Sequence, residues 1–399
     1  MKLRLRLIAL ALLSYFAVQS QEITETKFGK GIFNVVAKDS SWSMRFATRF
    51  QLLSTTSWEI ENDEFINPET SFLVRRARLK FDGFAYSPKL KYKIELGLSN
   101  RDISGANEFT RDAPRYVLDA VIKWNFYKNF TLWAGQTKLP GNVERVISSA
   151  NLQLVDRSRL NSRFNIDRDL GIQLRHHFNL TDRFLVREVV ALSQGEGRNV
   201  VEGNLGGHQY TSRLELLPFG KFEGKGDYKG SDLKREKKPK LLLAATYDFN
   251  ANAVKTRSNL GSYMFTANGL YETDIKTIFV DAVFKYRGFS FMGEFVDRDA
   301  GAPVAVEADG TPTGDIVEIG NAINLQMGYV FRSNWEIAGR YTNLNFDEIT
   351  GKELEQQYTL GVSKYISGHN LKVQSDISYT TLAGIGNNLM YRLQFDIHF

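Results

Sequence analysis

The chain has 399 residues, a formal net charge of +6 and no cysteine. The lack of cysteine excludes zinc–thiolate sites, cysteine nucleophiles and disulfide bonds. Without the three basic residues near the N-terminus the formal charge is only +3, so bulk charge gives no argument for nucleic-acid binding.

The first twenty residues resemble a secretory signal. Lys2, Arg4 and Arg6 precede an apolar run over residues 7–18, and small residues then suit cleavage before Gln21. The run is about half of the ~20 residues that a membrane-spanning helix needs. We therefore expect residues 1–20 to be a signal peptide and the mature chain to leave the cytoplasm.

From residue 42 onward, apolar and polar residues alternate as in strands with two different faces. In the last segment the apolar frame runs without a break from Leu389 to Phe399. Each predicted strand has about the 9–11 residues, or slightly more, that a tilted strand needs to cross a bilayer. Sixteen strands are predicted, at residues 42–53, 71–84, 89–99, 115–126, 129–138, 168–178, 182–194, 208–218, 239–249, 275–286, 288–297, 321–331, 334–343, 356–366, 369–379 and 389–399.

The connections between these strands alternate between tight turns and long polar loops. Short periplasmic turns and long external loops are typical of outer-membrane barrels. The long loops are expected at residues 54–70, 100–114, 139–167, 195–207, 250–274, 298–320, 344–355 and 380–388. One connection on the short-turn side, residues 219–240, is rich in Lys and Gly, and we interpret it as a flexible periplasmic insertion.

Strands can cross a bilayer only as a closed barrel, because backbone groups left unpaired in lipid cost several kcal/mol each. An even number of strands returns both chain ends to one side, and barrels of 16–18 strands leave an aqueous channel. The sequence therefore predicts an all-β fold, a transmembrane antiparallel β-barrel over residues 42–399. Residues 21–41 would form a short periplasmic N-terminal segment, in which residues 31–37 could add a strand that pairs with the first one.

The alternation also predicts which side chains face the lumen. Charged rings select ions, Arg and Lys favour anions, and the planar guanidinium can bind phosphate with two hydrogen bonds. Leu73 and Ala77 fall in the lipid-facing frame, and so does Arg75, which indicates either a position at the rim or a local bulge. The inward frame of the first two strands carries five basic residues, which could instead be simply the solvated wall: Arg45, Arg49, Arg76, Arg78 and Lys80.

The longest loop, residues 139–167, is the natural constriction element. Its apolar residues would let it pack against the inner wall, although an extracellular flap is the alternative. This loop and the strand ends beside it add six candidate pore-lining and anion-binding residues, namely Lys138, Arg145, Arg157, Arg159, Arg163 and Arg168.

Around this loop the sequence resembles the phosphate-selective porin O and P family. The similar stretches are Gly135–Pro140, Glu144–Arg145, Ser148–Ser149, Asp156–Ser158, Arg168–Gln173 and Arg75–Arg78. The resemblance implies a sixteen-stranded, trimeric porin whose inward-folded third loop and arginines guide anions down the pore. The chain departs from the family in Asp156, where Glu is frequent, in Gly141–Asn142, and in the insertion at residues 219–240.

No motif for a nucleophile, a metal pair or a nucleotide is present, so neither catalysis nor a cofactor or metal is expected. We expect passive diffusion of small anions such as phosphate. A general nonspecific porin and a structural or adhesive barrel are the alternatives. The expected partners are membrane lipid, lipopolysaccharide, further copies of the chain in a trimer, and the barrel-assembly machinery, which would read the last strand ending at Phe399.

Overall fold

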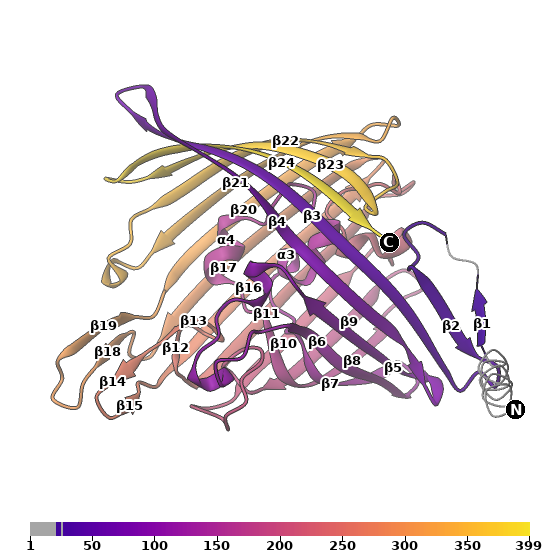
Figure 1. The fold of residues 1–399 in the computed structure, drawn as a ribbon, viewed down its shortest axis with the longest axis horizontal. Coiled ribbons are helices and arrows are strands. Elements are labelled where there is room, and N and C mark those ends of the chain that lie inside the picture. Colours follow the sequence, from indigo (N-terminus) through magenta and orange to yellow (C-terminus); the bar gives the residue numbers. More distant parts are fainter. Residues whose placement is uncertain (1–20, 25–26) are drawn as a thin grey trace, which may run out of the picture.

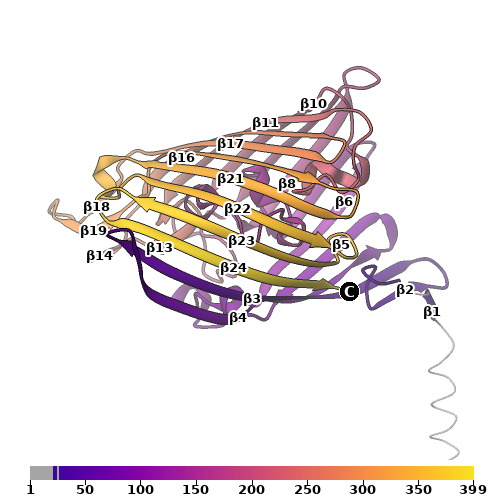
Figure 2. The same ribbon diagram turned by 90° about the horizontal axis from the view of Figure 1, so that it is seen from above.

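A computed structural model describes residues 21–24 and 27–399, so the signal peptide expected at residues 1–20 lies outside the described residues. The antiparallel barrel with sixteen strands is confirmed, since β24 pairs with β3 from Asn387↔Ile60 to His398↔Arg49 and closes the sheet (Figures 1 and 2). Its strands are β3 Trp42–Glu61, β4 Glu64–Ala85, β5 Ser87–Gly97, β6 Val117–Tyr127, β7 Phe130–Lys138, β8 Arg168–Asn179, β9 Leu185–Ser193, β10 Gln209–Leu217, β11 Lys240–Ala253, β16 Thr273–Tyr286, β17 Phe289–Ala300, β20 Gly320–Val330, β21 Trp335–Phe346, β22 Glu355–Tyr365, β23 Leu371–Leu382 and β24 Gly386–His398.

A short hairpin precedes the barrel. Its strands are β1 Gln21–Thr24 and β2 Phe33–Ala37, and β2 pairs with the beginning of β3 at Phe33↔Phe46. This pairing confirms the short strand expected at residues 31–37. The C-terminus lies at the same end of the barrel, because the amide of Phe399 donates to the carbonyl of Thr48 at 3.0 Å.

At the opposite end the connections carry small elements of their own. They are α2 Asn100–Ile103, η1 Glu108–Thr110, β12 Lys255–Arg257, β13 Leu260–Tyr263, β14 Phe265–Thr266, β15 Gly269–Leu270, β18 Val304–Val306, β19 Pro312–Ile316 and η4 Glu348–Thr350. None of the helices in the described part of the chain is long and apolar enough to cross a membrane.

The prediction of a loop at residues 54–70 is wrong. β3 and β4 instead continue as one long hairpin, with Ile60 paired to Phe65 near its tip. Only Asn62 and Asp63 form the turn, and both have positive φ, as a tight hairpin turn requires. Thr, Trp and Ile residues in this stretch favour strand, so the polar composition was a poor guide to where the strands end.

The two faces of the wall follow the predicted alternation. On β16, Ile278 and Val280 are exposed on the outside, whereas Thr277, Phe279 and Asp281 are buried on the inside. Apolar side chains outside and polar side chains inside are what a barrel in lipid requires.

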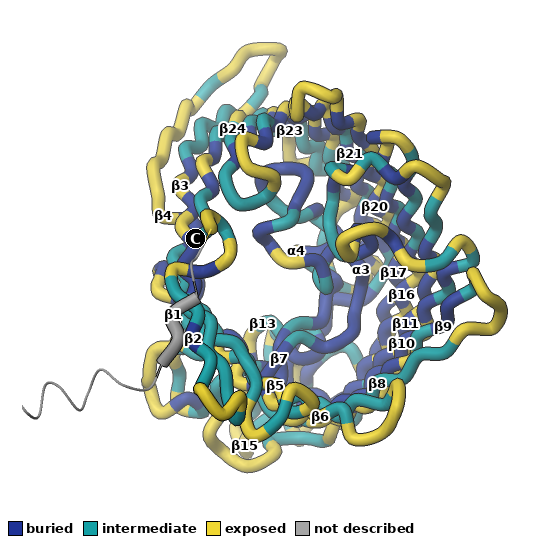
Figure 3. The backbone as a smooth tube through the Cα atoms, turned by 90° about the vertical axis from the view of Figure 1, so that its right-hand side faces the viewer, coloured by how far each residue is buried: buried dark blue, intermediate teal, exposed yellow. Residues whose placement is uncertain are grey.

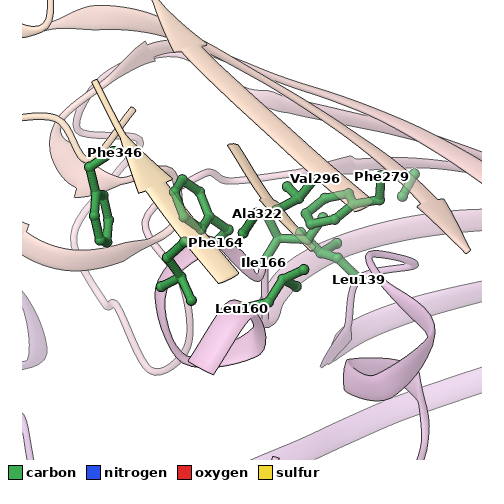
Figure 4. Packing of buried hydrophobic residues seen from close by; sticks show 10 residues of the cluster. Leu139, Leu160, Phe164, Ile166, Phe279, Val296, Ala322 and Phe346 are labelled. Carbon is green, nitrogen blue, oxygen red and sulfur yellow. The ribbon is translucent and has the colours of Figure 1, made fainter. Parts of the chain in front are cut away.

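Residues 139–167 lie inside the ring of strands (Figure 3). They contain α3 Val143–Val146, η2 Ser149–Asn151 and α4 Arg159–Phe164. The apolar side of α4 and its flanks packs against the inner wall, where Leu160, Phe164 and Ile166 form a buried cluster with Phe279 of β16 and Val296 of β17 (Figure 4). We call residues 139–167 the inner segment.

The insertion at residues 219–240, which contains η3 Glu223–Tyr228, is not the flexible excursion that its composition predicts. Phe222 is buried in an apolar cluster with Leu152 of the inner segment. The carboxylate of Asp232 accepts a hydrogen bond from the amide of Gly288 at 2.7 Å. Lys- and Gly-rich composition describes the exposed part of this segment but not the side chains that anchor it.

Candidate functional site

The interior contains a cavity of about 1990 Å³ between the inner segment and one side of the barrel wall. Most of its wall residues come from β4 to β10, and loops at the far end add others. Nineteen Arg and Lys side chains line it, against seven Asp and Glu side chains. The chain as a whole has 51 basic and 45 acidic residues, so positive charge is strongly concentrated here.

Two adjacent arginines of β4 enter this cavity because of a β-bulge. Gln51 of β3 pairs with Arg76 while Leu52 pairs with Val74, which leaves Arg75 without a partner across the ladder. A bulge turns two neighbouring side chains to the same face. It resolves the two readings of Arg75 in favour of the bulge.

The same bulge reverses the inward and outward faces of β4 in the residues that precede Arg75. Leu73, expected to face lipid, lines the cavity instead and pairs with Leu53. Its expected orientation is therefore wrong, because the extra residue at Arg75 shifts the frame by one.

Every carboxylate of the cavity already has a cationic partner. Asp156 of the inner segment lies 2.6 Å from Arg75 and 3.4 Å from Arg76. The other pairs are Glu95 with Arg78 and Lys93, Asp102 with Arg78, Asp119 with Lys93 and Arg168, Asp167 with Arg145 and Arg168, Glu215 with Arg187 and Arg213, and Asp227 with Arg187. The negative charges are thus neutralised within the wall.

Nine of the nineteen cations form no ion pair with any residue that the structure describes. They are Lys91, Arg101, Lys123, Lys138, Arg157, Arg175, Arg198, Lys225 and Arg257. Their uncompensated charge faces the solvent-filled space. The electrostatic potential of this lining therefore favours anions over cations.

Arg157 illustrates how such a cation is held. Its guanidinium donates to the carbonyls of Glu144 at 2.9 Å and Ile147 at 2.8 Å. Burial lowers the pKa of Arg157 to about 10, in spite of the nearby carboxylates of Glu144 and Asp156. The side chain stays charged at neutral pH and is fixed by neutral partners, the two backbone carbonyls.

Lys138 is held in the same way. Its ammonium donates to the carbonyls of Arg145 at 2.7 Å and Ile147 at 3.1 Å, which lie at the C-terminal end of the short helix α3. Carbonyl oxygens at a helix C-terminus carry partial negative charge and favour a cation. Lys138 therefore helps to fix the inner segment and adds positive charge to the cavity.

Toward the short-turn end, two cations flank one aromatic ring. The Lys123 ammonium lies 3.7 Å from the ring centroid of Trp133, and the Arg175 guanidinium lies 3.9 Å from it. Cation–π contact orients both side chains without removing their charge. The indole of Trp133 on β7 thus fixes the positions of two like charges on the strands that flank it, β6 and β8.

At the long-loop end, arginines from three different loops surround the cavity. Arg198 donates to the carbonyl of Arg115 at 2.9 Å, and Arg101 and Arg257 line the same region. Burial, followed by the neighbouring charge of Arg115, lowers the pKa of Arg198 to about 9, so it remains cationic at neutral pH. The basic character therefore extends from the wall into the loops.

The structure brings together seven of the eleven candidate residues around this cavity: Arg76, Arg78, Lys138, Arg145, Arg157, Arg159 and Arg168. The other four do not border it. Arg45 and Lys80 both pair with Asp82, Arg163 lies 3.7 Å from Glu318, and Arg49 is covered by the inner segment. Arg49 pairs with Asp396 and donates to Ser149, so its contacts are those of an anchor.

The candidate set omitted most of the cations on the later strands. Lys123, Arg175, Arg187 and Arg213 all lie in the inward frame of their strands, so the alternation could have identified them. Arg101, Arg198 and Arg257 lie in loops with no periodicity, and no sequence signal could have placed them at the cavity.

Comparison with known proteins agrees with this architecture. Residues 58–186, from β3 to β9 and including the inner segment, match the family described as phosphate-selective porin O and P. No curated protein matches the chain in sequence.

Among solved structures, the anion-selective porin from Comamonas acidovorans is similar with a TM-score of 0.55 and 10% identity over 90% of this chain and 100% of that one. OmpF of Salmonella typhi, in complex with daunomycin, has a TM-score of 0.54 and 10% identity, covering 90% of this chain and 99% of that one. The outer-membrane channel DcaP of Acinetobacter baumannii has a TM-score of 0.51 and 12% identity, with coverage of 90% and 99%. The chain has the fold of outer-membrane porins.

Proposed function

We propose that this outer-membrane barrel is a passive diffusion channel that prefers small anions, phosphate and related oxyanions among them. The observation that carries the proposal is the charge balance of the cavity, in which seven carboxylates are all paired and nine cations are not. Such a lining raises the local concentration of anions and repels cations.

The chemistry of the lining favours oxyanions in particular. Twelve of the lining cations lie on strands of the barrel wall, which are paired on both sides, so their donors are held in place before a ligand arrives. Arginine presents planar pairs of N–H donors that match the oxygens of phosphate. The family match over residues 58–186 and the anion-selective porin with the same fold support this assignment.

Passage requires that no group binds the anion too tightly. Several weak sites in series let an ion enter and leave, whereas one deep site would trap it. The unpaired cations are spread from the loop residues Arg198 and Arg257 to Lys91 and Lys225, rather than gathered at one point. We propose that anions move between them without a conformational cycle, with the inner segment as the main constriction.

The orientation of the barrel in the outer membrane follows from the same proposal. Residues 1–20 would be removed as a signal peptide, and the short-turn end with residues 21–41 and the insertion would face the periplasm. A homotrimer is the assembly that we propose, in line with the family resemblance.

The test is a reversal potential. The purified protein is inserted into a planar bilayer under a KCl gradient, and the sign of the zero-current potential reports which ion is more permeant. We expect chloride to be more permeant than potassium. A cation-selective potential would overturn the anion preference, and a barrel that inserts without conducting would favour a structural or adhesive role.

A further inference from the structure

The insertion at residues 219–240 connects β10 and β11 at the end of the barrel where the other connections are tight turns. Its own carboxylates are used to fold it. Asp227 pairs with Arg187 of β9, Asp232 accepts from the amides of Glu236 and Gly288, and Glu236 accepts from the amide of Glu223. Apart from the exposed Glu223, the remaining charges on its surface are basic.

The wall of the barrel holds this segment from the inside. The buried ammonium of Lys285, on β16, donates to three carbonyls of the insertion, those of Gly226 at 2.7 Å, Lys229 at 2.8 Å and Ser231 at 2.8 Å. The hydroxyl of Ser231 donates to the buried carboxylate of Glu336 on β21 at 2.7 Å. Because these partners belong to the inner face, the insertion folds into the barrel and not away from it.

Within the barrel the insertion meets the inner segment. The amide of Gly230 donates to the carbonyl of Asn151 at 2.8 Å. Phe222 packs in one buried cluster with Val143, Ile147 and Leu152. The two segments therefore form one continuous internal layer, one coming from the long-loop end and the other from the short-turn end.

The insertion also reaches the cavity itself, which Lys225, Asp227 and Tyr228 line. Asp227 is neutralised by Arg187, and the Tyr228 hydroxyl donates to Glu215 at 2.7 Å. Lys225 is exposed toward the cavity and forms no ion pair with a described residue. One uncompensated positive charge is thus the insertion's own contribution to the lining.

We propose that the insertion is a second constriction of the channel, in series with the inner segment, and that Lys225 is its selectivity residue. This inference rests on the proposed function as an anion-preferring channel. The narrowest parts of a pore limit conductance and exclude large solutes, and charge placed there acts at the shortest distance on the permeating ion. An anchored loop that fills part of the lumen supplies both properties.

The first experiment removes the loop. Residues 221–238 are replaced by an Asn-Gly turn, and folding is checked by the heat-dependent shift of the barrel on gel electrophoresis. We expect a single-channel conductance about twofold higher or more, since a series constriction is lost, and faster entry of neutral sugars into liposomes. A folded variant with unchanged conductance and unchanged sugar entry would overturn the constriction.

The second experiment tests the charge without removing the loop. Lys225→Glu should shift the reversal potential toward the cation side, whereas Lys238→Glu, the same change at an exposed position of the insertion that does not line the cavity, should leave it in place. Equal shifts in both variants would sink the role of Lys225. The two failures remain distinguishable: a cation-selective wild type contradicts the proposed function, while the conductance of the loop variant still reports on the constriction.

Discussion

Arg75, the bulged residue of β4, donates hydrogen bonds to both carboxylate oxygens of Asp156 in the inner segment, at 2.6 and 2.8 Å. Arg76 approaches the same carboxylate at 3.4 Å. Two arginines on one wall therefore share one carboxylate on the segment that crosses the lumen. This arrangement fixes the position of the segment and leaves the group of three side chains with a net positive charge.

Replacing Asp156 with Asn tests that arrangement. Burial opposes the charge of Asp156, yet Arg75 and Arg76 hold its pKa well below the ordinary range, so the removed group is an anion. We expect Asp156→Asn to increase the preference for chloride over potassium, and to destabilise the barrel by about 2 kcal/mol because charged hydrogen bonds are lost. Reversal potentials and thermal unfolding in detergent measure the two effects.

The matched control for this change is Asp309→Asn, which removes a carboxylate from an exposed loop that does not line the cavity. It should alter neither selectivity nor unfolding temperature. An unchanged reversal potential in Asp156→Asn would mean that permeating ions do not sense this pair.

Arg157 is the cation that we expect to matter most for phosphate. Arg157→Gln keeps a hydrogen-bond donor but removes a charge that forms no ion pair with a described residue, so phosphate should block chloride current about tenfold less strongly. The block is measured as the phosphate concentration that halves the current. Arg163 lies on the same inner segment but outside the cavity and pairs with Glu318, so phosphate should block the current through Arg163→Gln as strongly as through the wild type.

The positions of the strands could be predicted because the alternation of apolar and polar residues is long and regular. At Arg75 the alternation leaves two interpretations open, a rim position or a bulge, since inserting one residue into a ladder leaves no trace in composition and only breaks the frame locally. An unbroken alternation consequently places Leu73 on the wrong face. The stretch at residues 54–70 shows the opposite limit, because most of its residues are polar and it reads as a loop although it continues the strands β3 and β4.

The candidate site was predictable where it lies on strands and unpredictable where it depends on loops. Arg76 and Arg78 follow from the inward frame, whereas Arg168 was a candidate only as the strand end beside the long loop. Arg198 and Lys225 reach the cavity only through the folding of segments without periodicity, one of which is anchored by Lys285 of β16. Charge composition alone predicted a flexible insertion, since it cannot distinguish a solvated lysine from one that binds backbone carbonyls.

Arg49 tests whether the inner segment is held in place from the wall. Its guanidinium pairs with Asp396 at 2.9 Å and donates to the hydroxyl and the carbonyl of Ser149 at 2.8 and 2.9 Å. We expect Arg49→Ala to loosen the segment, which should appear as larger fluctuations of the open-channel current and a lower unfolding temperature.

Arg45→Ala is the appropriate comparison. Arg45 lies on the same strand and pairs with Asp82, but it does not contact the inner segment and is partly exposed. Its loss should leave the current noise unchanged. Equal noise in the two variants would show that Arg49 stabilises the wall and not the segment.

The loop at residues 194–208 provides a prediction about pH. Burial, followed by the nearby charge of Asp169, raises the pKa of Glu196 from 4.5 to about 7. Because the folded state holds this proton more tightly than the unfolded loop does, its stabilising contribution is complete below about pH 4.5 and is lost as the pH rises through 7. The cost at high pH is the buried negative charge beside Asp169, which should destabilise the loop even though the amide of Leu205, at 3.2 Å, donates to the Glu196 carboxylate and favours its charged form.

Hydrogen exchange at pH 5.5 and pH 8, corrected for the intrinsic exchange rate, measures this effect. We expect residues 194–208 to lose protection at the higher pH in the wild type. In Glu196→Gln, which stays neutral at both values, protection of the loop should be the same at both. Protection of the strand β11 serves as the internal reference, since its pairing with β10 and β16 does not involve Glu196. A loop whose protection changes equally with pH in both proteins would show that another group, not Glu196, responds to pH.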